Sequence, residues 1–117
     1  MKILLVEDNA MTRQVIKALL MKLGHEIAGE AEDGEQAVRY FTELRPDVVF
    51  LDLVLPGRSG LEVLEDLRGM DPKARVVVIT AVTQEEIDLK LYHQGVDAIL
   101  RKPFSMGDFK TLMKNLA

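Results

Sequence analysis

Short apolar runs alternate with longer mixed segments along the whole chain. Three runs are uninterruptedly apolar, over residues 3–6, 48–51 and 76–79, and two are weaker, over residues 27–28 and 96–100. β-Branched residues are frequent in the stronger runs, and strands that are buried on both faces of a sheet have this composition. The pattern therefore predicts five β-strands, three of them buried on both faces.

The segments between the runs have helical periodicity. In the first segment apolar residues recur at every fourth position, and in the last they follow the i, i+3, i+4, i+7 spacing of an amphipathic helix. We expect these positions to form the apolar faces of two helices: Met11, Val15, Leu19 and Leu23 in the first segment, and Phe109, Leu112, Met113 and Leu116 in the last.

Particular residue pairs and single residues mark where helices begin and end. A Ser, Thr or Asp followed three positions later by Glu or Gln is a capping box, which satisfies free backbone N–H groups at a helix start. Glycine or proline then ends a helix, through a left-handed cap or through the exclusion of helical geometry. The starts are Asp33 with Gln36, Ser59 with Glu62, Thr83 with Glu86 and, less clearly, Ser105 with Asp108, and the stops are Gly24, Arg45-Pro46 and Gly95.

Five alternating β-α units with short connections predict an α/β fold, in which helices cover both faces of a doubly wound parallel sheet. The length of 117 residues suits a single domain with one core. In sheets of this kind the ligand site lies at the carboxyl ends of the strands. We therefore look for functional residues where each apolar run ends.

The overall composition excludes several classes of protein. The net charge is −4 and no Lys/Arg cluster stands out, which argues against direct binding of nucleic acid. No apolar run is long enough to span a bilayer, and the N-terminal segment lacks the long apolar stretch of a signal peptide. Cysteine is absent, so disulfides and thiolate zinc sites are excluded. We expect a soluble cytoplasmic protein that makes no contact with a membrane.

Polar residues follow the apolar runs at the predicted strand ends. They are Glu7 and Asp8 after the first run, Asp52 after the third, Thr80 after the fourth and Lys102 after the fifth. Three carboxylates at one rim would repel one another by ~3 kcal/mol per pair at ~5 Å and an effective dielectric constant near 20. Mg²⁺ suits such a cluster because it takes hard oxygen ligands and accepts phosphate oxygens. An aspartate beside a metal, a lysine and a hydroxyl is equipped to act as the nucleophile in phosphoryl transfer.

At these positions the sequence resembles the receiver domains of two-component response regulators, and the chemotaxis regulators in particular. The matching motifs are LLVEDN at 4–9, DVVFLDLVLPGRSG at 47–60, VVVITA at 76–81 and LRKPF at 100–104. Their order and spacing cover essentially the whole chain. The resemblance implies a flavodoxin-like (βα)₅ fold with strand order 2-1-3-4-5, and a single receiver domain over residues 1–117.

The resemblance also implies a role for each acidic residue. Asp52 would be the phosphoacceptor and, with Asp8, a direct Mg²⁺ ligand. Glu7 would hold the metal through a water molecule, and the backbone carbonyl of Val54 would complete the protein ligands. Mn²⁺ is expected to substitute for Mg²⁺. The chemistry implied is the protein's own phosphorylation and dephosphorylation, not that of an enzyme.

The remaining implied roles concern phosphoryl binding and partners. Thr80 and Lys102 would bind the phosphoryl oxygens, with Pro103 as a cis-proline that aims Lys102 into the site. The donor would be a sensor histidine kinase or a histidine phosphotransfer protein. Phosphorylation would change the face formed by the fourth helix, fifth strand and fifth helix. That face would be read by a downstream protein target, an output domain or a second copy in a phosphorylation-dependent homodimer.

Three positions depart from the commonest family pattern. Val54 and Val82, two residues after Asp52 and Thr80, flank the path of a water molecule attacking the phosphoryl group. Neither side chain can orient that water by hydrogen bonding. Ile99 stands at the switch position, three residues before Lys102, where the family usually carries an aromatic ring that turns inward on activation. We therefore expect a long-lived phosphorylated form and a switch without an aromatic component.

Two other functions compete with a phosphorylated switch. An enzyme of the haloacid-dehalogenase type also uses an aspartyl phosphate on a parallel sheet, but it needs a second aspartate where this chain has Val54. A pseudo-receiver, which binds partners without phosphorylation, would be expected to have a damaged site, and here all five polar positions are present. Both alternatives are therefore less favoured.

Overall fold

The computed structural model describes residues 1–116 and contains one five-stranded parallel sheet in the order β2-β1-β3-β4-β5. The strands are Lys2–Val6 (β1), Glu26–Ala31 (β2), Val48–Asp52 (β3), Arg75–Thr80 (β4) and Ala98–Arg101 (β5). The helices are Ala10–Lys22 (α1), Gly34–Leu44 (α2), Gly60–Met70 (α3), Glu85–His93 (α4) and Met106–Leu116 (α5). The predicted α/β class, the parallel sheet and the strand order are confirmed.

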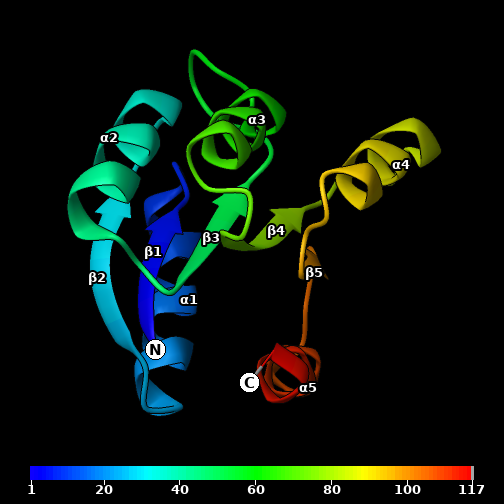
Figure 1. Ribbon diagram of the computed structural model, residues 1–117. Coiled ribbons are helices and arrows are strands. Elements are labelled where there is room, and N and C mark those ends of the chain that lie inside the picture. The colour runs from blue at the N-terminus through cyan, green and yellow to red at the C-terminus, as the bar shows by residue number, and fades with distance from the viewer. Residues whose placement is uncertain (117) are drawn as a thin grey trace.

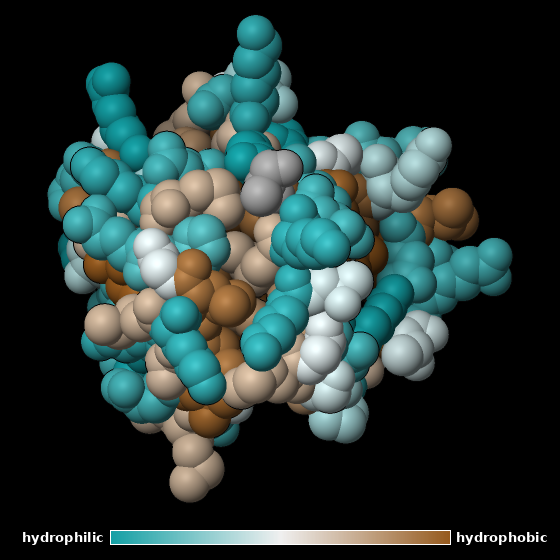
Figure 2. Space-filling view, turned by 90° about the horizontal axis from the view of Figure 1, so that it is seen from below, coloured by the Kyte–Doolittle hydropathy of each residue, from teal (hydrophilic) through white to brown (hydrophobic). Residues whose placement is uncertain are grey.

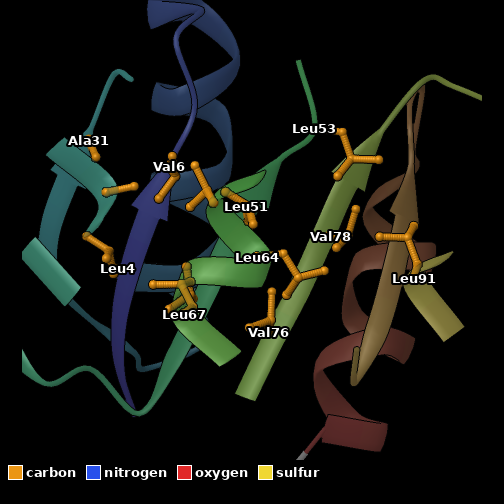
Figure 3. Close-up of a cluster of buried hydrophobic side chains, with 13 residues drawn as sticks. Leu4, Val6, Ala31, Leu51, Leu53, Leu64, Leu67, Val76, Val78 and Leu91 are labelled. Atoms are coloured by element: carbon orange, nitrogen blue, oxygen red, sulfur yellow. The ribbon is translucent and has the colours of Figure 1, made fainter. Parts of the chain in front are cut away.

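Helices cover both faces of the sheet, which explains the uninterrupted apolar runs. Successive side chains of a strand point to opposite faces, so a strand between two helical layers must be apolar at every position. Figure 1 shows α2, α3 and α4 along the upper side of the sheet and α5 on the lower side. Residues from α2, α3 and α4 form one buried cluster with the sheet, part of which is labelled in Figure 3. Residues from α1 and α5 form a second cluster on the opposite face.

The helix starts agree in part with the predicted capping boxes. Asp33 accepts a hydrogen bond from the Gln36 N–H, and Ser59 accepts one from the Glu62 N–H. Ser105, which was the weaker prediction, forms the complete reciprocal box with Asp108, with both hydrogen bonds present. α1 has an N-cap that the sequence pattern did not single out, Asn9, whose side chain accepts from the Thr12 N–H. Local sequence thus located most helix starts.

The predicted capping box at Thr83 is wrong. α4 begins one residue later, with Gln84 at the N-cap position, and the Gln84 side chain makes no capping hydrogen bond. The first helical hydrogen bond runs from the Asp88 N–H to the Gln84 carbonyl. The Thr83 hydroxyl therefore lies one residue too early to cap the helix, and α4 starts without a side-chain cap.

The predicted apolar face of the first helix is buried only in part: Leu19 packs against the core, but the first two positions do not. Met11 is 80% exposed and Val15 is 51% exposed, whereas Ile16 and Leu20 are fully buried against the sheet. A spacing of four residues advances 400° around a helix of 3.6 residues per turn, so such a stripe rotates by about 40° at each step. The stripe therefore drifts away from the core, and a neighbouring pair of positions packs against the sheet.

Two strands differ in length from the runs that predicted them. β2 extends on both sides of the weak run at 27–28. It lies at the edge of the sheet and most of it is only half-buried, so its sequence need not be apolar throughout and the run under-predicts its length. β5 starts at Ala98, two residues later than the run at 96–100. Val96 instead donates its N–H to the Leu91 carbonyl and completes the turn after α4.

The surface seen in Figure 2, from below the view of Figure 1, has exposed apolar groups between projecting hydrophilic side chains. Exposed apolar residues of this kind, scattered singly, are normal in soluble domains and need no special function. Within residues 1–116, no helix has both the length and the apolar character needed to cross a membrane.

Candidate functional site

Polar residues from four strands meet at one edge of the sheet. Glu7 and Asp8 directly follow β1, Asp52 is the last residue of β3, Thr80 is the last residue of β4, and Lys102 directly follows β5. The carboxyl ends of parallel strands lie at the same edge, so residues far apart in the sequence are brought to one rim. The structure therefore gathers the five positions singled out by the sequence.

Lys102 joins two of the carboxylates. Its ammonium nitrogen Nζ lies 2.9 Å from Glu7 Oε1 and 3.2 Å from Asp52 Oδ2, and it donates a hydrogen bond to each. Glu7 and Asp52 are both buried, whereas Lys102 keeps contact with solvent. Buried charges are usually paired and hydrogen-bonded, because burial removes their hydration. Lys102 therefore offsets part of the cost of burying the Glu7 and Asp52 carboxylates.

The electrostatics of the cluster are dominated by burial. Burial raises the pKa of Glu7 to about 7, and the neighbouring Asp52 carboxylate adds to the rise while Lys102 opposes it. Burial alone would lower the pKa of Lys102, but the hydrogen bond and charge of Glu7, together with the charge of Asp52, outweigh it and raise that pKa. The site therefore contains more negative charge than one lysine neutralises.

The arrangement of oxygen atoms fits a divalent cation. One carboxylate oxygen from each of Glu7, Asp8 and Asp52 lies within 4.8 Å of the others. Glu7 Oε2 is buried and has no hydrogen-bond partner among residues 1–116. A buried oxygen without a partner is costly, and hard carboxylate oxygens are the ligands that Mg²⁺ prefers. The donor set and the unpaired oxygen together fit a magnesium site.

The backbone after β3 holds Asp52 in place. The Val54 N–H donates to Asp52 Oδ1 over 3.0 Å, and the Gly60 N–H donates to the Leu53 carbonyl over 2.8 Å. A Cβ atom at Gly60 would overlap the backbone of Asp52 and Leu53. The sequence indicated only that a helix starts at Ser59, next to this glycine. Its close approach to the aspartate was missed, because no local pattern reports which backbone a glycine will contact.

Thr80 lies beside the cluster and is almost fully buried. Its hydroxyl oxygen accepts a hydrogen bond from the Val82 N–H over 2.9 Å, and its backbone carbonyl accepts one from the Lys102 N–H over 2.9 Å. Thr80 is therefore connected both to the loop that follows β4 and to the backbone of the lysine.

The remaining positions singled out by the sequence lie around this rim. Val54 is 64% exposed and Val82 is half-buried, so both side chains reach the surface near the site. Ile99 is half-buried in β5 and packs against the apolar cluster formed by α2, α3 and α4. The peptide bond between Lys102 and Pro103 is cis.

A family model described as the response regulator receiver domain matches residues 3–114. Among curated proteins, the chemotaxis protein CheY of Thermotoga maritima is 33% identical over 103 residues, which is 88% of this chain and 86% of that protein.

Solved structures with the same fold include two complexes with beryllofluoride. The response regulator TrrA from Thermotoga maritima, in complex with Mg²⁺ and beryllofluoride, is 34% identical with a TM-score of 0.87. The similarity covers 99% of this chain and 98% of that one. The CheX–CheY complex with beryllofluoride and magnesium from Borrelia burgdorferi has a TM-score of 0.93 at 25% identity, over 98% of this chain and 87% of that one.

Proposed function

The chain belongs to the response regulator receiver domain family, and from this premise we propose that Asp52 accepts a phosphoryl group from a phosphohistidine partner. The partner would be a sensor histidine kinase or a histidine phosphotransfer protein. We also propose that residues 1–117 act as one receiver unit. The observation that carries the proposal is the buried Asp52 carboxylate, held by Lys102 within a cluster of three carboxylates that fits a divalent cation.

Three residues of the rim have different roles in the proposed phosphoryl transfer. An Asp52 carboxylate oxygen forms a bond to phosphorus while the bond from phosphorus to the donor imidazole nitrogen breaks, and the imidazole leaves with the electron pair. Lys102 places a positive charge beside Asp52, where the phosphoryl oxygens would arrive. The Thr80 hydroxyl supplies a donor at the same rim. This chemistry is mostly positioning and neutralisation of charge, which a rigid rim performs well.

The proposed metal site uses oxygen donors from two strand ends. Asp8 and Asp52 would be direct ligands, Glu7 would bind through water, and the Val54 carbonyl would complete the set. When bound there, Mg²⁺ neutralises negative charge on the phosphoryl oxygens, and Mn²⁺ shares its preference for carboxylate and carbonyl oxygen.

The two competing functions are less well supported. An enzyme of the haloacid-dehalogenase type needs a carboxylate at position 54, and this chain offers an exposed valine whose N–H is bonded to Asp52. A pseudo-receiver would not need the paired Lys102, Glu7 and Asp52. Receiver domains are signalling domains, and we propose that the only reaction of this one is its own phosphorylation and dephosphorylation.

We propose that partners read the signal on the face formed by α4, β5 and α5. Leu89 and Tyr92 are exposed on α4, and a cleft of about 510 Å³ lies between α4 and β5, with Tyr92 and Ile99 in its lining. A downstream target, an output domain or a second copy of the chain in a phosphorylation-dependent homodimer would bind there. The absence of cysteine favours a cytoplasmic location for this exchange.

The direct test is adduct formation on Asp52. With acetyl phosphate and Mg²⁺, the parent should gain one phosphoryl group, which mass spectrometry of proteolytic fragments should locate at Asp52. Asp52→Asn should gain none at this site, because an amide is not a nucleophile of this kind. Asp71→Asn, a similar change at an exposed residue directly after α3, is the matched control and should behave as the parent does. An unmodified parent, or modification elsewhere only, would contradict the proposal.

A further inference from the structure

We propose that Arg101 is a positioning residue that ties the loop after β4 to helix α4 and is released when Asp52 is phosphorylated. This inference rests on the proposed function, because it concerns how the same site is read. Its evidence, however, is separate, and lies in the contacts of one arginine at the end of β5.

Arg101 bridges two segments that are adjacent in the sequence, the loop after β4 and helix α4. It is the last residue of β5, and in the sheet it pairs with Thr80. Its Nη1 donates to the Val82 carbonyl over 2.6 Å, and its Nη2 lies 2.8 Å from Asp88 Oδ1 in the first half of α4. One side chain thus holds both the loop and the helix.

Two successive hydrogen bonds connect Arg101 to Thr80 at the rim where Asp52 lies. The Thr80 hydroxyl oxygen accepts from the Val82 N–H, and the Val82 carbonyl accepts from Arg101. If the Thr80 side chain turns toward a phosphoryl group on Asp52, the Val82 N–H loses its acceptor. The Val82 backbone then moves, and with it the carbonyl that Arg101 holds.

The ion pair between Arg101 and Asp88 is suited to being broken. The two side chains are 39% and 40% exposed, so solvent can replace their contact. The contact of Arg101 with Asp88 Oδ1 is a close pair of opposite charges without hydrogen-bond geometry, so little directional bonding is lost when it separates.

The two ends of α4 are held unequally, which directs its movement. At its C-terminal end, Arg68 of α3 donates from Nε to the Gln94 carbonyl over 2.7 Å and from Nη2 to the Gly95 carbonyl over 2.9 Å. At its start, Gln84 provides no side-chain cap. Ile87 packs against the apolar core, and among the described residues Arg101 makes the only side-chain ion pair to the first half of the helix. Release of that pair would let this half move about a fixed end.

A contact that exists in only one of two states changes the affinity of any ligand that favours the other state. If phosphorylation breaks the Arg101 contacts, a variant that lacks them needs less free energy for the conformational change. A phosphoryl analogue should then bind more tightly. A residue with a purely structural role would stabilise both states equally and would leave this affinity unchanged.

The experiment is a titration with beryllofluoride in excess Mg²⁺, followed by NMR resonances of residues around Asp52 and of α4. Arg101→Gln should bind about three- to tenfold more tightly than the parent, the range expected for partly exposed, charge-assisted contacts. Its α4 resonances should lie, before any addition, part of the way toward their positions in the parent adduct. Arg101→Lys keeps the positive charge but cannot contact Val82 and Asp88 at the same time. Its affinity for beryllofluoride should lie between those of the parent and Arg101→Gln.

Asp88→Asn gives an independent variant at the other end of the ion pair. It should also tighten binding, but by less, because the hydrogen bond to Val82 remains. Combined with Arg101→Gln it should add nothing further, since both changes remove the same contact. The matched control is Arg58→Gln, which removes ion pairs to Glu62 and Asp66 of similar exposure, both within the segment of α3. This control should bind as the parent does.

The outcomes separate the two proposals. A parent that forms no adduct at Asp52 overturns the proposed function and this inference together. A parent that forms the adduct, with Arg101→Gln and Asp88→Asn showing equal or weaker affinity, overturns the role of Arg101 alone and leaves phosphorylation at Asp52 standing.

Discussion

At the scale of single residues, the two valines beside the site set the expected lifetime of an aspartyl phosphate. The Val54 side chain is exposed, and its N–H is already committed to Asp52 Oδ1. Val82 is half-buried, and both of its backbone polar groups are hydrogen-bonded, to Thr80 and Arg101. Hydrolysis needs a water molecule positioned behind phosphorus, and these residues present only apolar side chains to it. We therefore expect slow dephosphorylation.

Val54→Asn should accelerate dephosphorylation. The new amide group can hydrogen-bond the attacking water, and one such bond, worth about 1 kcal/mol in the transition state, corresponds to about a fivefold rate increase. The measurement is the decay of the phosphorylated protein after removal of acetyl phosphate. Val54→Ala, which changes size without adding a hydrogen-bonding group, is the control and should decay at nearly the parent rate. Equal rates for Val54→Asn and the parent would refute the role assigned to the valine.

At the scale of elements, the start of α3 is fitted to the end of β3. The Gly60 N–H binds the Leu53 carbonyl, and the absence of a side chain lets the helix approach the Asp52 backbone closely. Glycine in a helix is usually unfavourable compared with alanine because it loses more conformational freedom on folding. At this position the close contact reverses that preference.

Gly60→Ala should lower the free energy of unfolding by about 1–3 kcal/mol, the usual cost of inserting a carbon atom where packing is complete. Gly69→Ala, in the same helix with open space around it, should instead raise stability by about 0.5–1 kcal/mol. Urea unfolding of the two variants and the parent compares these effects directly. If Gly60→Ala is as stable as Gly69→Ala, the contact between α3 and the Asp52 backbone has been assigned wrongly.

At the scale of the whole molecule, the acidic rim connects stability to divalent cations. Glu7, Asp8 and Asp52 come together only in the folded chain, so a cation that binds them stabilises the folded state. Repulsion among these carboxylates opposes folding when no cation is bound. The negative charge that the proposed phosphoryl transfer would use therefore has a cost in stability.

Mg²⁺ should raise the free energy of unfolding by about 1.4 kcal/mol at a concentration ten times its dissociation constant. Asp8→Ala should abolish most of this increase by removing a ligand. Glu43→Ala, at an exposed acidic residue near the C-terminal end of α2, should retain it. Denaturation midpoints in EDTA and in Mg²⁺ give the comparison. Coinciding midpoints for the parent would exclude a metal site at this rim.

The sequence by itself determined the positions of the strands, most of the helix ends and which polar residues lie at the rim. Apolar runs such as 48–51 can be satisfied only by burial, and residues that follow parallel strands must share one edge. Capping at Asp33, Ser59 and Ser105 is decided within one turn of helix, so local sequence was sufficient. The order of the strands came from resemblance to a family, because periodicity does not say which strands are neighbours.

Only the tertiary structure decided how the rim is charged and held. Lys102 meets Glu7 across 95 positions of the chain, and the burial that raises the pKa of Glu7 exists only once helices close over the sheet. The buried face of α1, the contact of Gly60 with Asp52 and the bridge from Arg101 to α4 are equally invisible in local pattern. Each depends on which surfaces meet, and that is set by packing between elements distant in the sequence, not by the residues on either side.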